Sequence, residues 1–339
     1  MVAEATSGVA QQCPAGDAQY DARVRFAISI PQFYADGEFD PAAFRAYLTR
    51  VEQLGFDSAW TQEQTLGSKP QLGPIETMTY AAACTERLRL GCVVFVSTLH
   101  SPVHLAKSIS SLDQISRGRI EVGFGTGGKQ RPFAAFGIGP ERYVARFYEG
   151  IEVMTRLWRD SRVGYSGEFW QLTDAAMEPK PFQKPNPPLW FGGSGRTALR
   201  RAVMSPGLFS GFFGAGQVPT ASFAEQVRTV RQALAESGRP TKDFTIAKRV
   251  YIAVDGDAQR ARDRINAELA ALYTKRSPEI EAAAIAGTPM DCVRALREVV
   301  AVGAELILFT PLFEPAEHAE RLASQVMPEL EVGLGKDRP

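Results

Sequence analysis

The sequence predicts an α/β fold, a (β/α)₈ TIM barrel with an insertion near the barrel mouth. Apolar, β-branched segments alternate with amphipathic segments, and this alternation can be followed eight times along the chain. The stretch 88–128 shows the repeating unit best: a strand at Arg89–Val96, a helix that begins at Pro102, a strand at Arg119–Phe124, and a Gly-Thr-Gly-Gly loop at 125–128. Two strands joined by one helix lie parallel, so the loops after both strands fall at the same end of the sheet. An open, doubly wound sheet is the alternative that strand counting leaves open.

Each predicted strand is short and apolar, and several predicted helices carry a start or a stop signal. Asp40 and Pro41 suit the N-cap and the first turn of the first helix, and Gly55 ends it. The segment Ser161–Pro188 breaks the alternation with aromatic and proline residues, and we expect it to lie over the barrel mouth. The strands are predicted at Val24–Ile30, Ser58–Thr61, Arg89–Val96, Arg119–Phe124, Leu189–Gly192, Gly207–Phe213, Phe244–Val254 and Glu305–Phe309. The helices are predicted at 41–54, 74–85, 102–116, 140–160, 195–204, 220–237, 257–275, 288–302 and 315–330.

The composition favours one globular domain without a nucleic-acid or membrane partner. With 339 residues, 45% of them hydrophobic, the chain can form one large core, and we expect residues 24–332 to form it, with 1–23 and 333–339 as tails. Lys plus Arg and Asp plus Glu each number 38, so no net charge favours nucleic acid or an anionic membrane. Residues 1–23 lack the apolar region of a secretory signal, and no segment has the apolar length to cross a bilayer. The four cysteines are scattered, which favours a reducing, cytoplasmic location.

Two glycine-containing loops are candidates for binding an anionic group. The glycines at 123, 125 and 128 match GxGxxG, but the chain does not open directly into a helix there, so a tight loop is favoured over a dinucleotide fingerprint. The sequence Gly-Gly-Ser-Gly-Arg-Thr at 192–197 joins a strand to a helix. Its backbone N–H groups, with the hydroxyls of Ser194 and Thr197, would form an anion cradle. The alternative is a simple N-cap at Ser194.

The three histidines have no metal-ligand spacing, so no metal site is expected. His100 lies in a loop at the predicted mouth and is a candidate for contacting a substrate. His104 falls inside a helix, where we expect a structural role, and His318 falls near two glutamates on what we expect to be a solvated helix face.

Other polar and aromatic residues follow the predicted strands. Glu63 and Gln64 place polar groups at the mouth after the second strand. Arg249 lies within an apolar strand, and we expect it to point into the barrel mouth because a charge buried elsewhere would be costly. Four aromatic residues fall at strand ends: Phe33, Tyr34, Phe212 and Phe213. Such residues either cap the core or line an apolar pocket, and we expect about half of these four to lie in the core.

Taken together, several ordered blocks resemble the bacterial luciferase-like superfamily of flavin- or deazaflavin-dependent oxidoreductases. The resemblance runs from about Phe26 to Leu330. It is strongest in LGCVVFVSTLHSP and LAKSISSLDQISRGRIEVGFGTG (90–127), and continues in ERYVARFYEGIEVMTRLW, GEFW, EPKPFQKPNPPLWFGGSGRTALRRA and GTPMDCVRALREVVAVGAELILF. The resemblance implies a (β/α)₈ barrel with reduced FMN or coenzyme F420, a deazaflavin, lying across its mouth.

The resemblance also implies where the cofactor binds. Its phosphate would lie at Gly193, Ser194, Gly195 and Thr197, and its ring would rest on a bulge of the third strand, often with a non-proline cis peptide, at Val93-Val94. Thr126 and Gly127 would lie beside the cofactor, and Arg142 and Arg146 would help to bind its phosphate tail.

One departure bears on the reaction. Luciferases and sugar-phosphate dehydrogenases of this superfamily carry an acid followed by histidine after the second strand, whereas this chain has Glu63 followed by Gln64, and glutamine does not relay a proton near pH 7. The dehydrogenases also carry a glutamate where this chain has Gly128, so both activities are disfavoured. We expect a reductase that passes hydride from reduced F420 to an activated alkene, imine or carbonyl, with a tyrosine, water or Glu63 as proton donor. Glu63, Gln64 and His100 are the predicted catalytic residues.

Two other functions stay open at this point. One is an FMN-dependent monooxygenase, and the other is a non-catalytic flavin-binding barrel, which the absence of the histidine allows. The forms GGSGRTALRRA and GFGTGG resemble the deazaflavin branch and favour F420. The expected partner is a small-molecule substrate, and the resemblance implies a possible homodimer.

Overall fold

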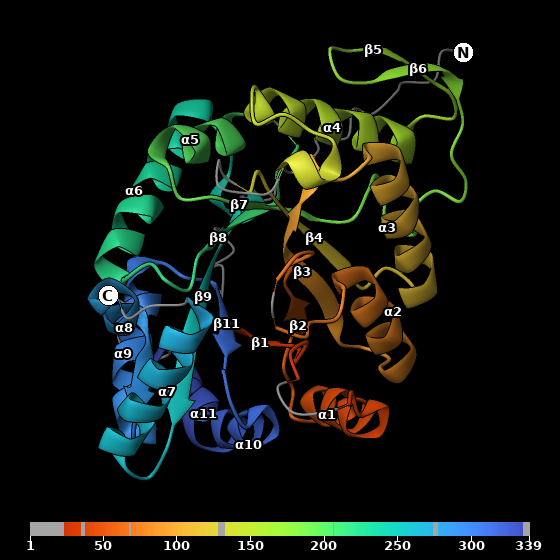
Figure 1. Cartoon of the computed structure of the whole chain (residues 1–339). Helices are drawn as coiled ribbons and strands as arrows, with labels where there is room; N and C mark the ends of the chain where they lie inside the picture. The colour runs from red at the N-terminus through yellow and green to blue at the C-terminus, as the bar shows by residue number, and fades with distance from the viewer. Residues whose placement is uncertain are drawn as a thin grey trace, which may run out of the picture.

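Eight parallel strands close into a barrel, surrounded by helices (Figure 1). The computed structural model describes residues 24–34, 38–67, 69–127, 133–205, 207–273 and 277–334. The barrel strands follow one another in the order β9-β11-β1-β2-β3-β4-β7-β8, and β8 pairs again with β9, which closes the ring and excludes the open sheet. The strands are β1 (Arg25–Ser29), β2 (Ser58–Thr61), β3 (Arg89–Val96), β4 (Ile120–Gly125), β7 (Leu189–Gly192), β8 (Gly211–Gly214), β9 (Thr245–Val254) and β11 (Leu306–Thr310). All eight coincide with predicted strands.

The helices begin and end close to the predicted positions. Asp40 caps the first helix as expected, because its Oδ1 accepts hydrogen bonds from the N–H groups of Ala42 and Ala43 at 2.8 and 3.1 Å. Thr288 and Asp291 form a capping box at the start of α9. The helices are α1 (Pro41–Gln53), α2 (Pro74–Cys84), α3 (Pro102–Ser116), α4 (Tyr143–Arg159), α5 (Arg196–Met204), α6 (Thr220–Ser237), α7 (Ala258–Leu272), α8 (Pro278–Ala283), α9 (Pro289–Val302), α10 (Pro315–Arg321) and α11 (Met327–Leu334).

A few elements were not predicted. A short strand β10 (Ile285–Gly287) extends the pairing of β9, and α8 precedes it. A π-helical turn, Leu322–Val326, joins α10 to α11, so the last helical segment ends at Leu334, four residues beyond the predicted end. The predicted tail 1–23 lies outside the described residues, as do residues 335–339.

The insertion lies beside the mouth and not across it, so the expectation that Ser161–Pro188 covers the opening is wrong. Its hairpin, β5 (Val163–Ser166) and β6 (Gln171–Ala175), lies outside the ring of helices beyond α4 (Figure 1). The following segment packs on α3: Gln114 donates a hydrogen bond to the Lys180 carbonyl at 2.7 Å, and Asp113 accepts one from the Gln183 N–H at 2.8 Å. Both contacts lie near the C-terminal end of α3, and Gln183 also donates to the carbonyl of Ile120 at the start of β4, so this segment lies at the end of the barrel opposite the mouth.

Bulky side chains fill the barrel below its mouth. Trp60, Trp190 and Phe213 contact one another edge-on or tilted, with ring centroids 4.7 to 5.8 Å apart. Gly91 lies against this cluster, where a Cβ atom would come within 2.3 Å of the Trp60 ring. Glu121 is buried here, accepts a hydrogen bond from Trp190 Nε1 at 2.6 Å and forms an ion pair with Arg89. The interior is therefore solid up to the level of Trp60, and a ligand must bind above it.

Two predictions for histidine are wrong. His318 is 2% exposed, so it does not lie on a solvated face. Its ring packs edge-on against Phe313, and burial lowers its pKa. His104 is exposed on α3 and has no structural role in the core. Helix periodicity alone could not separate these positions, because the face that α10 presents to the barrel depends on how it docks.

Among the helices that the structure describes, none is long and apolar enough to cross a membrane. Over the same residues, no group of three His, Cys, Asp or Glu side chains is arranged to hold a metal ion.

Candidate active site

A bulge in β3 lies at the centre of the mouth. The pairing of β3 with β4 shifts between Cys92 and Phe95, and the peptide bond between Val93 and Val94 is cis, as the resemblance implies. Val93 lines a cavity in the mouth. The side chain of Val94 lies against Gly125 of β4 and Gly192 of β7.

Both of these glycines are required by the close approach of Val94. A Cβ atom on Gly192 would lie 2.2 Å from Val94 Cγ1, and one on Gly125 would lie 2.7 Å from Val94 Cγ2. A Cβ on Gly125 would also lie 3.2 Å from the Gly192 carbonyl oxygen. The two glycine-containing loops therefore start side by side at one end of the barrel, as expected for loops that bind one ligand.

The first of these loops is tied to the loop after β3. Thr98, which is fully buried, donates a hydrogen bond to the Thr126 carbonyl at 3.0 Å. Thr126 and Gly127 are half-buried beside it, and Gly127 has a φ of 78°. Gly128, where the resemblance implies a glutamate in the dehydrogenases, lies outside the described residues.

The second loop leads into an uncapped helix. Gly195 is the N-cap of α5 and makes no side-chain cap, so the alternative of an N-cap at Ser194 is wrong. Ser194, Gly195 and Thr197 are exposed and Gly193 is half-buried. The first N–H groups of a helix have no intrahelical acceptor, and the dipole favours an anion there. The turn is thus an open helix start with two exposed hydroxyl groups, and its role as an anion cradle stays a prediction.

The two arginines at the start of α4 hold the insertion. Arg142 forms an exposed ion pair with Glu168 at 2.8 Å. The guanidinium of Arg146 lies 4.5 Å from the ring centre of Trp170 and donates to the Thr98 carbonyl at 3.3 Å, and its partial burial lowers its pKa. Both side chains have protein partners, and their contact with a phosphate stays a prediction.

Glu63 and His100 come together from different loops. His100 Nε2 lies 2.7 Å from Glu63 Oε1, and Glu63 Oε2 accepts the Val96 N–H at 2.6 Å. The Glu63 side chain is 5% exposed and that of His100 is 28% exposed. A buried carboxylate thus orients a histidine that solvent or a ligand can reach. This carboxylate–histidine pair can hold and transfer a proton.

Gln64 does not join this pair. Its side chain is exposed and turned toward its own loop, where its Nε2 lies 2.0 Å from the position that a Cβ on Gly67 would take. The histidine that pairs with Glu63 is His100, which follows the next strand. The local sequence around position 64 could not show this pairing, because the two residues lie 37 positions apart.

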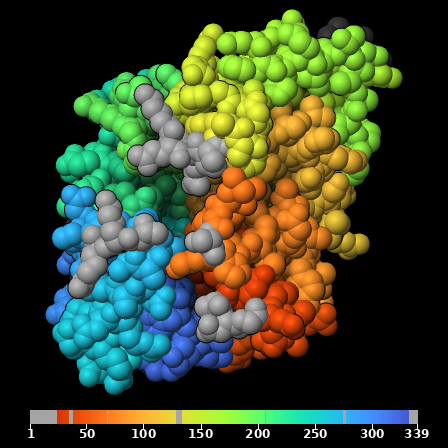
Figure 2. Space-filling model, in the orientation of Figure 1, coloured from red at the N-terminus to blue at the C-terminus, as the bar shows by residue number. Residues whose placement is uncertain are grey.

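A cavity of about 370 Å³ occupies the other side of the mouth, between β1, β2, β9 and β11. Figure 2 shows the surface hollowed between the orange segment that follows β2 and the cyan and blue segments of α7 and the β11–α10 loop. Phe33 and Tyr34 line this cavity, whereas Phe212 and Phe213 are buried, so half of the four aromatics lie in the core as expected.

Arg249 points into this cavity, as predicted, and its neighbour Lys248 points away from it. Arg249 Nη1 donates to Gln62 Oε1 at 2.8 Å, and Nε donates to Thr310 Oγ1 at 3.1 Å. Lys248 lies on the outer face of β9, where its Nζ donates to the carbonyls of Ala215 and Val218 at 2.5 and 2.8 Å. Burial lowers the pKa of Lys248 to about 7.

Sequence reasoning missed three site residues: Gln32, Gln62 and Thr310. Gln32 is 2% exposed, and its side chain bonds both the N–H and the carbonyl of Gln62, at 2.7 and 3.1 Å. This contact fixes the backbone from which Gln62 reaches Arg249. The available signal was position: Gln62 directly follows β2, Gln32 lies in the loop after β1, and Thr310 ends β11.

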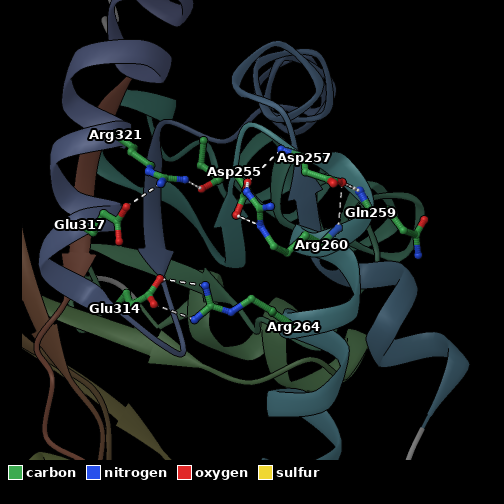
Figure 3. A network of polar contacts seen from close by, with 9 residues as sticks. Asp255, Asp257, Gln259, Arg260, Arg264, Glu314, Glu317 and Arg321 are labelled. Carbon is green, nitrogen blue, oxygen red and sulfur yellow. Dashed lines mark hydrogen bonds and ion pairs between the residues drawn. The ribbon is translucent and has the colours of Figure 1, made fainter.

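Ion pairs brace the outer wall of the cavity (Figure 3). Arg264 of α7 forms two hydrogen bonds with Glu314, at 2.9 and 2.8 Å, and thereby ties α7 to the β11–α10 loop. Asp255, at the end of β9, pairs with Arg260 of α7, and this contact lowers its pKa to about 2. Because α7 supplies Glu268 and Leu272 to the cavity, and the β11–α10 loop supplies Leu312, the braced elements are the wall itself.

The fold and the site together define a parallel barrel with an open helix start and a cavity at one mouth. The family model described as luciferase-like monooxygenase matches residues 24–306. The chain therefore belongs to the luciferase-like monooxygenase family, and the resemblance seen in the sequence is confirmed.

Similar proteins include members named for coenzyme F420. The chain is 25% identical over 326 residues to an F420-dependent glucose-6-phosphate dehydrogenase of Intrasporangium calvum, covering 86% of this chain and 96% of that protein. The first curated relatives match about half of their length or less; the uncharacterized protein y4vJ of Sinorhizobium fredii is 30% identical over 152 residues, 44% of this chain and 43% of that protein.

Solved structures share the fold at low identity. Monooxygenase RslO1 of Streptomyces bottropensis superposes with a TM-score of 0.78 at 23% identity, covering 90% of this chain and 99% of that one. The coenzyme F420 dependent tetrahydromethanopterin reductase of Methanopyrus kandleri superposes with a TM-score of 0.75 at 19% identity, covering 91% and 99%.

Proposed function

We propose that this protein is an oxidoreductase that uses reduced coenzyme F420 to reduce a small organic substrate. The observation that carries the proposal is the position of the β3 bulge. Val93 faces the cavity, while Val94 lies against the two glycines that lead into the glycine loop and the open start of α5. The Val93-Val94 dipeptide would thus contact both parts of a flat cofactor's site: the surface under its ring and the turn that holds its phosphate tail.

The residues present fit such a cofactor. Gly193, Ser194, Gly195 and Thr197 would hold its phosphate with backbone N–H groups and hydroxyls, and a Cβ on Gly195 would meet nothing within 4 Å, so the approach is open. Val93, Val94, Thr126 and Gly127 would border the ring. Reduced F420 would supply a hydride to an activated alkene, imine or carbonyl carbon of the substrate.

The Glu63–His100 pair would supply the matching proton. Hydride addition leaves a negative charge on the neighbouring atom of the substrate, and a proton delivered there completes the reduction. Glu63 is fixed by the Val96 N–H, three residues after Val93, and holds the His100 ring by its Nε2 atom. This pair would give the proton from His100, in place of the tyrosine, water or Glu63 considered from the sequence.

An FMN-dependent monooxygenase is the second candidate, favoured by the description of the matched family. The hypothesis of a non-catalytic flavin-binding barrel depended on the absence of a histidine after Glu63. Because His100 contacts Glu63, that absence no longer supports the hypothesis. A sugar-phosphate dehydrogenase stays disfavoured, because Gln64 stands where the resemblance implies a histidine in those enzymes and its side chain is exposed.

Cofactor binding tests the proposal directly. The full-length protein should be titrated with F420 and, separately, with FMN, following cofactor fluorescence. We expect F420 to bind at least tenfold more tightly than FMN. Nanomolar binding of FMN without binding of F420 would contradict the proposal and favour the monooxygenase.

A further inference from the structure

The polar floor of the cavity contains hydrogen-bond donors without acceptors. Because Gln62 Oε1 accepts from Arg249, the Gln62 amide is oriented with its Nε2 free to donate, and no described residue accepts from it. Thr310 Oγ1 likewise accepts from Arg249 Nε, which leaves its O–H as a donor. The remaining guanidinium N–H groups of Arg249 also have no acceptor among the described residues.

The charge at this floor is not balanced locally. Within the described residues, no carboxylate lies within ion-pair distance of Arg249, whose guanidinium instead lies 5.3 Å from the ring centre of Tyr251. Glu268 and Lys69, of opposite charge, also line the cavity. A cation in an enclosed, partly apolar site favours a ligand that brings a negative charge and two acceptor oxygens, because a guanidinium binds carboxylates in a bidentate manner.

Most of the remaining lining is apolar, although Ser29, Gln32, Tyr34 and Thr61 also border the cavity. Trp60, Val93, Leu308 and Leu312 border the cavity with Phe33, and its volume of about 370 Å³ lies near the small end of ligand pockets. A sugar would leave its hydroxyl groups without partners along these side chains, and a phosphate monoester would bring a second charge into them. A compact apolar body suits this lining.

From these observations we infer that the cavity binds a small monocarboxylate with an aromatic or branched aliphatic body. Arg249, Gln62 and Thr310 hold the carboxylate, and the body extends along the apolar wall to Val93. The inference names the substrate class of the proposed reductase and therefore rests on the proposed function. Arg249, Gln62 and Thr310 are then specificity-determining residues.

The test measures binding without cofactor, so its result is independent of the proposed reaction. The full-length protein is titrated calorimetrically with phenylacetate and cyclohexanecarboxylate, and with phenylacetamide and cyclohexanecarboxamide as neutral analogues of the same shape. We expect each acid to bind at least tenfold more tightly than its amide. Equal affinity of acid and amide, or no binding of either acid, would overturn the inference.

Variants then assign the effect to Arg249. Arg249→Met should weaken acid binding at least tenfold and leave amide binding within threefold, and Arg162→Met, on the distant hairpin, should change neither. Because Arg249 also holds Gln62 and Thr310, Gln62→Glu provides a second route: its new carboxylate would pair with Arg249 and exclude the acid while the barrel stays intact. Acid binding that survives in both Arg249→Met and Gln62→Glu would refute the assignment.

The two proposals can fail separately. If F420 binds tightly but no acid binds in preference to its amide, the substrate class is wrong and the reductase proposal stands. If the acids bind through Arg249 but F420 does not bind, the substrate class stands and the cofactor is wrong.

Discussion

The two sides of the barrel mouth are built in different ways. The side at β4, β7 and α5 presents backbone N–H groups, glycines and the hydroxyls of Ser194 and Thr197, all from short continuous segments. The side at β1, β2, β9 and β11 presents side chains that converge from four strands, such as Gln62, Arg249 and Thr310. Under the proposed function, the first side would hold the phosphate of the cofactor. The second suits a particular substrate, because each lining side chain can change without altering the backbone.

The Glu63–His100 pair is expected to take part in the reaction and not in binding on either side of the mouth. Its removal should therefore have the largest effect on activity. His100→Gln should lower kcat/KM by about 10²- to 10⁴-fold, the range for loss of a general acid, with F420 affinity within threefold of the parent. Steady-state assays with reduced F420 across pH would measure this, because loss of the proton donor should also alter the pH profile.

The matched control for that prediction is His104→Gln, since His104 is exposed on α3. It should leave kcat/KM unchanged. Equal losses in the two variants, or an unaltered pH profile in His100→Gln, would show that His100 does not transfer the proton.

A charge at the start of α5 should disable the phosphate side alone. Ser194→Asp places a carboxylate where the cofactor phosphate would lie, so like-charge repulsion should weaken F420 binding at least tenfold. Affinity for phenylacetate in the cavity should stay within twofold. Fluorescence titration checks the first effect and calorimetry the second.

An aspartate elsewhere on the surface controls for the added charge. Ser161→Asp, at an exposed position after α4, should leave F420 affinity unchanged. If Ser194→Asp binds F420 as tightly as the parent does, Ser194 is not part of the cradle. The side at β4, β7 and α5 could then no longer be described as the phosphate-binding side.

The smallest effect should come from the braces of the cavity wall. The pKa of Asp255 is lowered to about 2 from 3.8 by its hydrogen bond with Arg260, so the folded state binds its proton less readily than the unfolded state does. The resulting stability is fully present above about pH 4 and is lost as the pH falls toward 2. Asp255→Asn should therefore cost about 1 to 2 kcal/mol of unfolding free energy at pH 7.

Denaturant unfolding at pH 7 and at decreasing pH would check this expectation. The difference between parent and variant should shrink as the pH falls from 4 to 2. Asp160→Asn, at an exposed position, should show no such trend. A gap that is constant with pH would mean that Asp255 stabilises the wall through packing and not through its charge.

Most of the framework could be predicted because it depends on local patterns. All eight barrel strands were found from short apolar runs, and the helix at Asp40 was found from its cap. The cis bond at Val93-Val94 followed from the resemblance. The paths of surface segments were harder. The insertion 161–188 was placed over the mouth, and His318 on a solvated face, because nothing in the local sequence specifies the surface against which a segment packs.

The sequence by itself determined the barrel and the positions of the glycine-containing loops at its mouth, because period-2 and period-3.6 patterns, caps and glycine turns act over a few residues. Only the tertiary structure decided that His100 meets Glu63 in place of Gln64, and that Gln62 and Thr310 orient Arg249. Those contacts join residues 37, 187 and 61 positions apart. Their geometry depends on which strands are neighbours and on the face to which each side chain points, and both are fixed only when the barrel closes.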